Sequence, residues 1–168
     1  MLDSIEFNEY EKSVFLSKAQ EDIVKELYSG KYTGESFERT EELRRELESL
    51  VTQKKYQDKD KQNSDVLQDS KYTHTVFNLP TDCLYIVYEQ VSWSTDNTCL
   101  SNLIADVIPT THDEYWRTRN NPFRGPNSKK VLRLDNKEAQ VELVSNGTID
   151  TYILRYLKKP EPIVLEDF

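Results

Sequence analysis

The chain has 168 residues, which is enough for one domain that buries a core, or for one domain with a helical arm. Its formal net charge is −8, which argues against general nucleic-acid binding because phosphate repulsion opposes every contact. No apolar run follows a basic start and none approaches about eighteen residues, so we expect neither secretion nor a membrane span. The two cysteines, Cys83 and Cys99, are expected to be free thiols.

Residues 1–52 form the predicted N-terminal helical region, which contains a pair of amphipathic helices. The first is expected from Asn8 to Ser29, because its apolar residues recur at helical spacing and Gly30 supplies a C-terminal stop: Leu16, Ala19, Ile23 and Leu27. The second is expected across residues 36–51, where a similar stripe recurs: Phe37, Leu43, Leu47 and Leu50.

Residues 53–70 are predicted to be a polar linker or exposed loop. The stretch from Thr52 to Asp65 is almost wholly polar and mixed in charge, without apolar periodicity. The alternative is a solvated extension of the second helix. Most of the net negative charge lies in the N-terminal part of the chain, since residues 1–70 hold 17 acidic and 11 basic residues, a net charge of −6.

Residues 71–168 are predicted to form a mainly antiparallel β domain, because β-branched and aromatic residues dominate there. Asn146-Gly147 between two apolar-alternating runs indicates a two-residue hairpin. The fold class is therefore α+β. The expected strands are 73–78, 84–92, a short one near Val107, 130–135, 139–145 and 148–159.

A basic loop, residues 115–133, stands out in this acidic chain. It contains six basic residues and no acidic one: Arg117, Arg119, Arg124, Lys129, Lys130 and Arg133. Thr111 is placed to cap a short helix that Asn120-Asn121-Pro122 ends. One interpretation is that Trp116 and Phe123 cover the sheet while the arginines are solvated.

The other interpretation makes this loop a protein interface, because Arg, Tyr and Trp are enriched at binding hot spots. The C-terminal tail, residues 160–168, is a second candidate, since its prolines force an extended path before an apolar triplet. That triplet either closes the sheet of its own domain or adds a strand to a neighbour. The candidate interface residues are Tyr115, Trp116, Arg117, Arg119, Phe123, Arg124, Pro160, Pro162, Ile163, Val164 and Leu165.

We expect no catalytic, cofactor or metal site. His74, His112 and the two cysteines lack ligand spacing, and the four glycines are placed as turns rather than in a nucleophile or phosphate motif. A hydrolase that uses Asp113 and Glu114 remains an alternative; it would need metal-dependent turnover. A monomeric adaptor or regulatory protein that binds a single partner protein is the other.

Three segments together resemble a known family: YEKSVFLSKAQEDIVKELYSG, THDEYWRTRNNPFRGPNSKKVLRLD and YILRYLKKPEPIVLEDF. They are similar to the ring structural proteins stacked beneath the portal in the head-to-tail region of crAss-like tailed bacteriophages. The similarity covers both ends of the chain and the basic loop, whereas residues 52–102 carry no recognisable motif.

The resemblance implies a virion protein that forms a cyclic homo-oligomer, a dodecamer to match the portal. It would bind the portal and neighbouring ring or tail proteins, and DNA would pass through its lumen without sequence-specific binding. The family has no catalytic residues to transfer. We assign its interface elements to the helix 8–29, the loop 115–124 and the tail 160–165.

Overall fold

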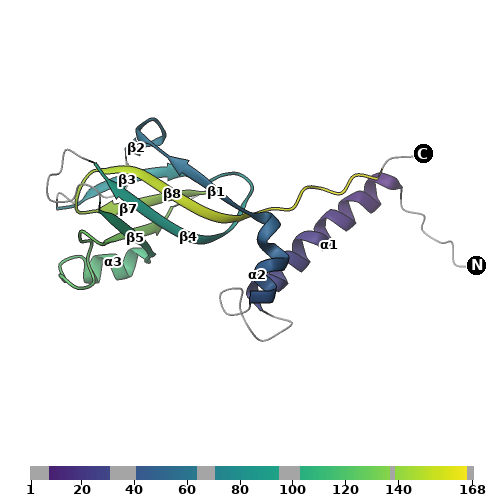
Figure 1. The fold of residues 1–168 in the computed structure, drawn as a ribbon, viewed down its shortest axis with the longest axis horizontal. Helices are drawn as coiled ribbons and strands as arrows, with labels where there is room; N and C mark the ends of the chain where they lie inside the picture. The colour runs from purple at the N-terminus through teal and green to yellow at the C-terminus, as the bar shows by residue number, and fades with distance from the viewer. Residues whose placement is uncertain (1–7, 31–40, 64–70, 95–102, 137–138, 166–168) are drawn as a thin grey trace, which may run out of the picture. The chain divides into compact units, whose positions relative to one another are not determined.

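The computed structural model describes residues 8–30, 41–63, 71–94, 103–136 and 139–165. They divide into two compact units (Figure 1). Unit 1 comprises the described parts of Met1–Val51 and Leu157–Phe168, and unit 2 comprises the described parts of Thr52–Tyr156. The described part of the C-terminal tail thus falls in the same unit as the N-terminal helices.

Helix α1 of unit 1, Glu9–Ser29, confirms the first predicted helix. It begins with a capping box, in which the Asn8 side chain accepts from the Glu11 N–H and the Glu11 carboxylate accepts from the Asn8 N–H. It ends at Gly30, whose φ of 70° is left-handed and therefore favours glycine. Both ends of α1 are fixed by local sequence.

The second helix is shorter than predicted. Helix α2 spans Glu41–Leu47 and tightens into the 3-10 turn η1, Glu48–Leu50, before strand β1 starts at Val51. Leu47 is buried, as its place in the predicted stripe requires. The residues 36–40 of the predicted helix lie outside the described part of the chain.

Much of the predicted linker is regular structure. It contains most of β1, Val51–Tyr56, together with the 3-10 turn η2, Asp58–Asp60, and the short strand β2, Gln62–Asn63. Strand β1 pairs with β8 and buries Tyr56. This strand is held by backbone pairing and by one buried aromatic residue. It therefore forms without the apolar alternation by which strands are predicted from sequence.

Unit 2 is built on a sheet of eight strands within the described residues, in the order β1-β8-β4-β5-β6-β7-β3-β2. The remaining strands are β3 Thr73–Asn78, β4 Cys83–Trp93, β5 Ile104–Pro109, β6 Lys130–Asp135, β7 Gln140–Ser145 and β8 Ile149–Lys158. The strand-rich C-terminal half is thereby confirmed.

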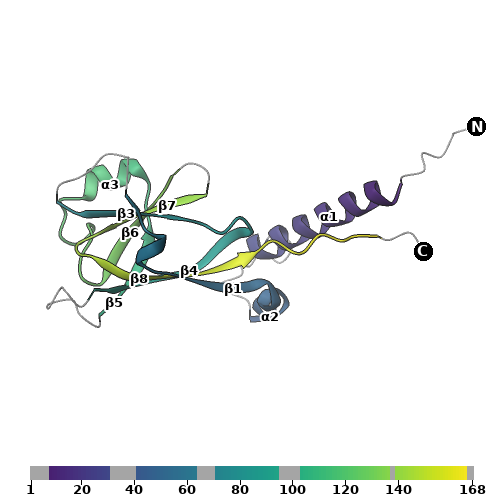
Figure 2. The ribbon, with the colours of Figure 1, turned by 90° about the horizontal axis from the view of Figure 1, so that it is seen from above.

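The sheet curls over a core of aromatic residues. Tyr56 on β1 packs against Phe77 on β3 and against Tyr152 on β8, with ring centroids 5.4 and 5.2 Å apart. Because β1 and β3 lie near opposite ends of the strand order, this contact brings the two ends of the sheet face to face. Figure 2 shows the resulting layers, with β3 and β7 on the side of helix α3 (His112–Thr118), and β4 and β8 on the other.

The sheet is mixed rather than wholly antiparallel. Strands β5 and β6 run parallel, with Val107 opposite Val131, whereas the β2–β3, β3–β7, β4–β5 and β6–β7 pairs are antiparallel. A parallel pair needs a crossover connection. Here that crossover is α3 together with the basic loop that follows it.

The predicted Asn146-Gly147 hairpin is wrong. Strand β7 pairs with β6 and β3, while β8 pairs with β1 and β4, so the two strands are not neighbours. A two-residue hairpin of this type needs positive φ at both turn residues. In the described chain, positive φ occurs at Gly30 and Ala139 and not at this turn. The turn instead carries the chain between layers, where the Ser94 N–H donates to the Thr148 carbonyl.

Candidate protein interface

Tyr115, one of the predicted interface residues, is part of the core. Its side chain is only 1% exposed and packs with Leu132, Leu134 and Val144 on the outer face of β6 and β7. Thr111 caps α3 by accepting from the Glu114 N–H, as the sequence predicted. Tyr115 therefore anchors α3 and supports the surface from beneath.

The other aromatic and basic residues of this segment reach the surface. Phe123 is 87% exposed, and Trp116 is partly exposed with the Arg119 guanidinium 4.3 Å from its ring centroid. Arg117 and Arg124 are both exposed. Exposed aromatic side chains close to arginines have the composition of a binding hot spot.

Hydrogen bonds fix the turn that carries Phe123. The Asn121 side chain accepts from the N–H groups of Phe123 and Arg124, at 2.9 and 3.3 Å. The Lys130 ammonium donates to the carbonyls of the same two residues, at 2.8 Å each. A Cβ at Gly125 would lie 2.8 Å from the Arg119 carbonyl oxygen, so glycine is needed there. The exposed ring sits on a preorganised backbone.

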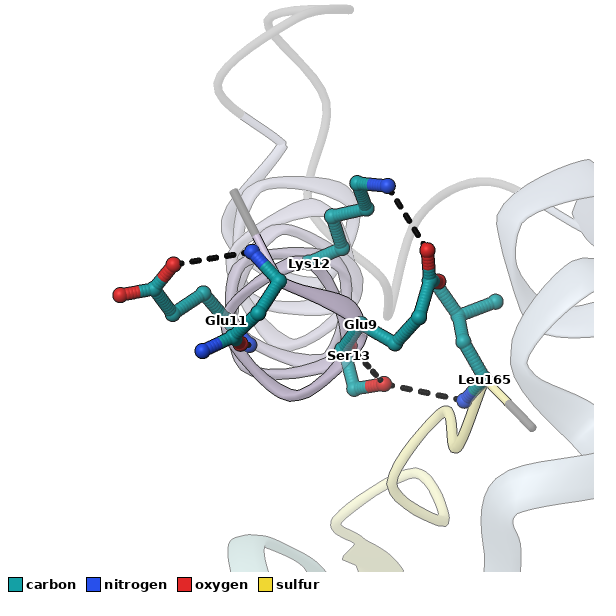
Figure 3. A network of polar contacts seen from close by, with 6 residues as sticks. Glu9, Glu11, Lys12, Ser13 and Leu165 are labelled. Carbon is teal, nitrogen blue, oxygen red and sulfur yellow. Dashed lines mark hydrogen bonds and ion pairs between the residues drawn. The ribbon is translucent and has the colours of Figure 1, made fainter. Parts of the chain in front are cut away.

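The tail of unit 1 runs antiparallel to α1 and is held by two serines. The Ile163 N–H donates to Ser17 Oγ at 2.8 Å. The Leu165 N–H donates to Ser13 Oγ at 2.9 Å (Figure 3). Each hydroxyl donates in turn to a helix carbonyl, of Ser13 and Glu9 respectively. Four helical residues rise about 6 Å and two extended residues about 6.6 Å, so serines four apart match alternate tail amides.

An apolar groove lies along this seam, with a volume of about 610 Å³. Its walls include Tyr10, Val14, Ile163, Val164 and Leu165, with Glu9 as its charged lining residue. Tyr10 is 77% exposed and Val164 is 73% exposed. Of the remaining predicted tail residues, Pro162 also lines the groove, and Pro160 is half-buried.

The apolar stripe predicted on α1 is largely uncovered. Ile23 and Leu16 are 53% and 44% exposed, and the buried residue of the helix is Val24. A single helix in water gains most of its stability from packing its apolar face. This stripe is therefore available for contact with another chain.

A buried polar network lies inside the curled sheet. The Glu89 carboxylate accepts from the Tyr152 hydroxyl and from Arg133. Burial raises the pKa of the Glu89 carboxyl, against the opposing charge of Arg133 and the hydrogen bond from Tyr152. Burial also raises the pKa of the Tyr152 hydroxyl, and the charge of Glu89 adds to the effect. The network joins three strands within the core.

The described residues contain no group of three or more His, Cys, Asp or Glu side chains that could hold a metal ion. Among them there is also no helix long and apolar enough to cross a membrane. Asp113 and Glu114, the acids of the hydrolase alternative, lie exposed in the first turn of α3.

The residues that position both surfaces are not among the predicted interface residues. Ser13 and Ser17 hold the tail, and Asn121 and Lys130 fix the Phe123 turn. The signal for the turn was present, because Asn two residues before Phe123 favours an Asx turn. Serines four apart on a helix carry no comparable signal, since they equally suit a solvated face.

Comparison with known proteins decides the family. A family model described as phage tail ring protein 3/4 matches residues 1–168. The chain belongs to this family. It is a ring structural protein of crAss-like phages, which confirms the resemblance seen in its helix, loop and tail segments.

Two relatives of this phage ring protein come from Bacteroides phage crAss001. "Ring protein 3" is 40% identical over 168 residues, which cover 98% of the chain and 71% of the relative. "Ring protein 4/5" is 28% identical over 170 residues, which cover 94% of the chain and 65% of the relative. The chain thus spans about two thirds of the length of each of these ring proteins.

Proposed function

We propose that this phage ring protein is a subunit of a cyclic homo-oligomer, a dodecamer, in the head-to-tail conduit below the portal. It binds other copies of itself and the adjacent rings, and it performs no catalysis. The observation that carries the proposal is the exposed apolar surface of α1 and the tail, which includes Tyr10, Ile23 and Val164. An apolar surface of this kind marks a protein contact.

The basic surface of unit 2 supplies the polar part of the proposed contacts. Arg117 and Arg124 are exposed in a chain of net charge −8, so another copy offers them acidic surface. The same net charge suits a conduit through which DNA slides, because an acidic wall repels phosphates. Binding to neighbouring chains would be driven by apolar burial and steered by the arginines.

The test is native mass spectrometry of the purified chain, first alone and then with the portal protein. A closed oligomer in either experiment is expected. Arg117→Glu with Arg124→Glu should weaken assembly, whereas the matched double reversal Lys55→Glu with Arg155→Glu, at exposed positions outside the loop, should not. A chain that stays monomeric with and without the portal would favour the adaptor alternative.

A further inference from the structure

The Phe123 turn, residues 121–125, is a rigid knob. Its aromatic ring is the most exposed large hydrophobic side chain in the described part of the chain, at 87%. Asn121, Lys130 and Gly125 fix the backbone beneath it. A flexible loop would lose conformational entropy on binding, but this turn has already lost it on folding. The Phe123 turn can therefore insert into a partner surface without a change of backbone conformation.

The α1–tail groove, lined by Tyr10, Val14 and Ile163–Leu165, is a hollow of suitable chemistry in the same protein. Its volume of about 610 Å³ falls within the range of natural binding sites, about 300–1,000 Å³. The polar groups of Ser13 and Ser17 that face the tail are occupied by its amides, so the groove presents mainly apolar side chains. It can therefore accept an aromatic ring without leaving these hydroxyls unpaired.

Charge favours this pairing. The charged side chain that lines the groove is Glu9, and Glu161 precedes the lining residue Pro162 in the tail. Arg124 follows Phe123 directly, and no acidic residue occurs between 115 and 133. Glu9 pairs with Lys12 at 2.8 Å, but a carboxylate can accept several hydrogen bonds and so can also receive Arg124.

We propose that the Phe123 knob of one copy inserts into the α1–tail groove of the next copy, with Arg124 beside Glu9. This proposal rests on the proposed self-assembly, in which this contact would join neighbouring copies. Knob and groove are different patches, so the contact is heterologous: each copy offers one knob and receives another. Repetition of such a contact closes a ring when the rotation between copies is suitable.

The first test removes the aromatic side chain of Phe123. Phe123→Ala should raise the concentration needed for half-assembly at least tenfold, because truncation of a central aromatic anchor is a typical hot-spot loss. Tyr88→Ala is the matched control, since it removes an exposed aromatic side chain elsewhere in unit 2 and should leave assembly unchanged. Far-ultraviolet circular dichroism of both variants checks that they are folded.

A charge exchange tests the predicted neighbours directly. Arg124→Glu should weaken assembly, and Glu9→Arg in the same chain should restore it at least partly, because the pair is reformed with opposite signs. Equal weakening by Arg124→Glu with and without Glu9→Arg would overturn the assigned pairing.

Mixed cysteine variants separate contacts between chains from contacts within one. In a background without Cys83 and Cys99, a Pro122→Cys chain, which keeps the Phe123 ring, is mixed with a Val164→Cys chain and oxidised mildly. A covalent heterodimer is expected, whereas a Lys55→Cys chain in place of Val164→Cys should give none. No heterodimer, together with normal assembly of Phe123→Ala, would overturn the knob contact and leave ring formation intact. A wild-type chain that never assembles, even with the portal, would overturn the proposed function itself.

Discussion

The two serines of α1 provide a direct test of how the tail is held. Replacement of Ser13 and Ser17 by alanine removes the acceptors of the Leu165 and Ile163 amides. A hydrogen bond of this kind contributes about 0.5–1.5 kcal/mol net, so the double variant should lose about 1–3 kcal/mol of tail attachment. Helix α1 itself should be preserved, because alanine is the best helix former.

These energies convert into rates of amide exchange. With RT near 0.59 kcal/mol, each single variant should raise the opening equilibrium at its own amide by about 2- to 13-fold, and the double variant by about 5- to 160-fold. The assay is hydrogen–deuterium exchange followed by NMR at Ile163 and Leu165. Ser29→Ala is the control, because the Ser29 hydroxyl bonds to the Glu26 carbonyl on the same helix and not to the tail.

Two results would refute this account. Unchanged exchange at both amides in the double variant would show that the hydroxyls do not hold the tail. Exchange of the Ile163 and Leu165 amides in the wild-type chain at the rate of an unstructured peptide would show that the tail is not attached in solution. A faster rate throughout α1 would instead indicate that the substitutions loosen the helix.

Three further predictions concern unit 2. Gly125→Ala should weaken assembly about as much as Phe123→Ala while leaving most of the sheet intact, because its Cβ would meet backbone oxygens at 2.8 and 2.9 Å; native mass spectrometry and circular dichroism together check this. Tyr152→Phe should lower the free energy of unfolding by about 1–3 kcal/mol, because Glu89 loses a buried donor; denaturant titration measures it. Burial raises the pKa of the Cys83 thiol to about 11, so in a Cys99→Ser chain its alkylation at pH 8 should be about a hundredfold slower than that of an exposed thiol of pKa near 9, and equal rates would contradict the assignment.

Local signals in the sequence predicted much of the fold. The helix predicted from Asn8 to Ser29 has a periodic stripe and a C-terminal glycine, and α1 forms over Glu9–Ser29 with Asn8 as its cap. Strands rich in β-branched and aromatic residues also formed, because their side chains suit a pleated surface. Thr111 likewise capped α3.

Pairing between strands could not be predicted in the same way. The direction of the β5–β6 pair depends on the crossover between the two strands. The composition of the basic loop indicates a charged surface and does not indicate that the loop is part of this crossover. Asn146-Gly147 favours a hairpin only when its φ angles become positive, and the packing of the layers imposed another path. Tertiary context overrode local preference in both places.

The candidate interface could be predicted only in part, because tertiary context also decides which side chains are exposed. Composition located the loop and the tail, but it could not separate Tyr115, which is buried, from Trp116 beside it, which is partly exposed. Adjacent residues on a helix point in different directions, and only the position of the sheet decides which one it covers. The interface roles of the remaining residues stay predictions until assembly is measured.

The seam between the tail and α1 has a built-in limit of length. The two segments have different repeat lengths: four residues of a helix rise about 6.0 Å, whereas two residues of an extended chain rise about 6.6 Å. The mismatch grows by about 0.6 Å with each repeat, so hydrogen bonds between serines and amides soon fall out of reach. One turn beyond Ser17 the helix carries Glu21 instead, whose pKa is lowered mainly by its hydrogen bond with Lys25 and also by the charge of Lys159, which directly precedes the tail. A long charged side chain tolerates a misalignment that a hydroxyl cannot, and adding serines to α1 would therefore not lengthen the seam.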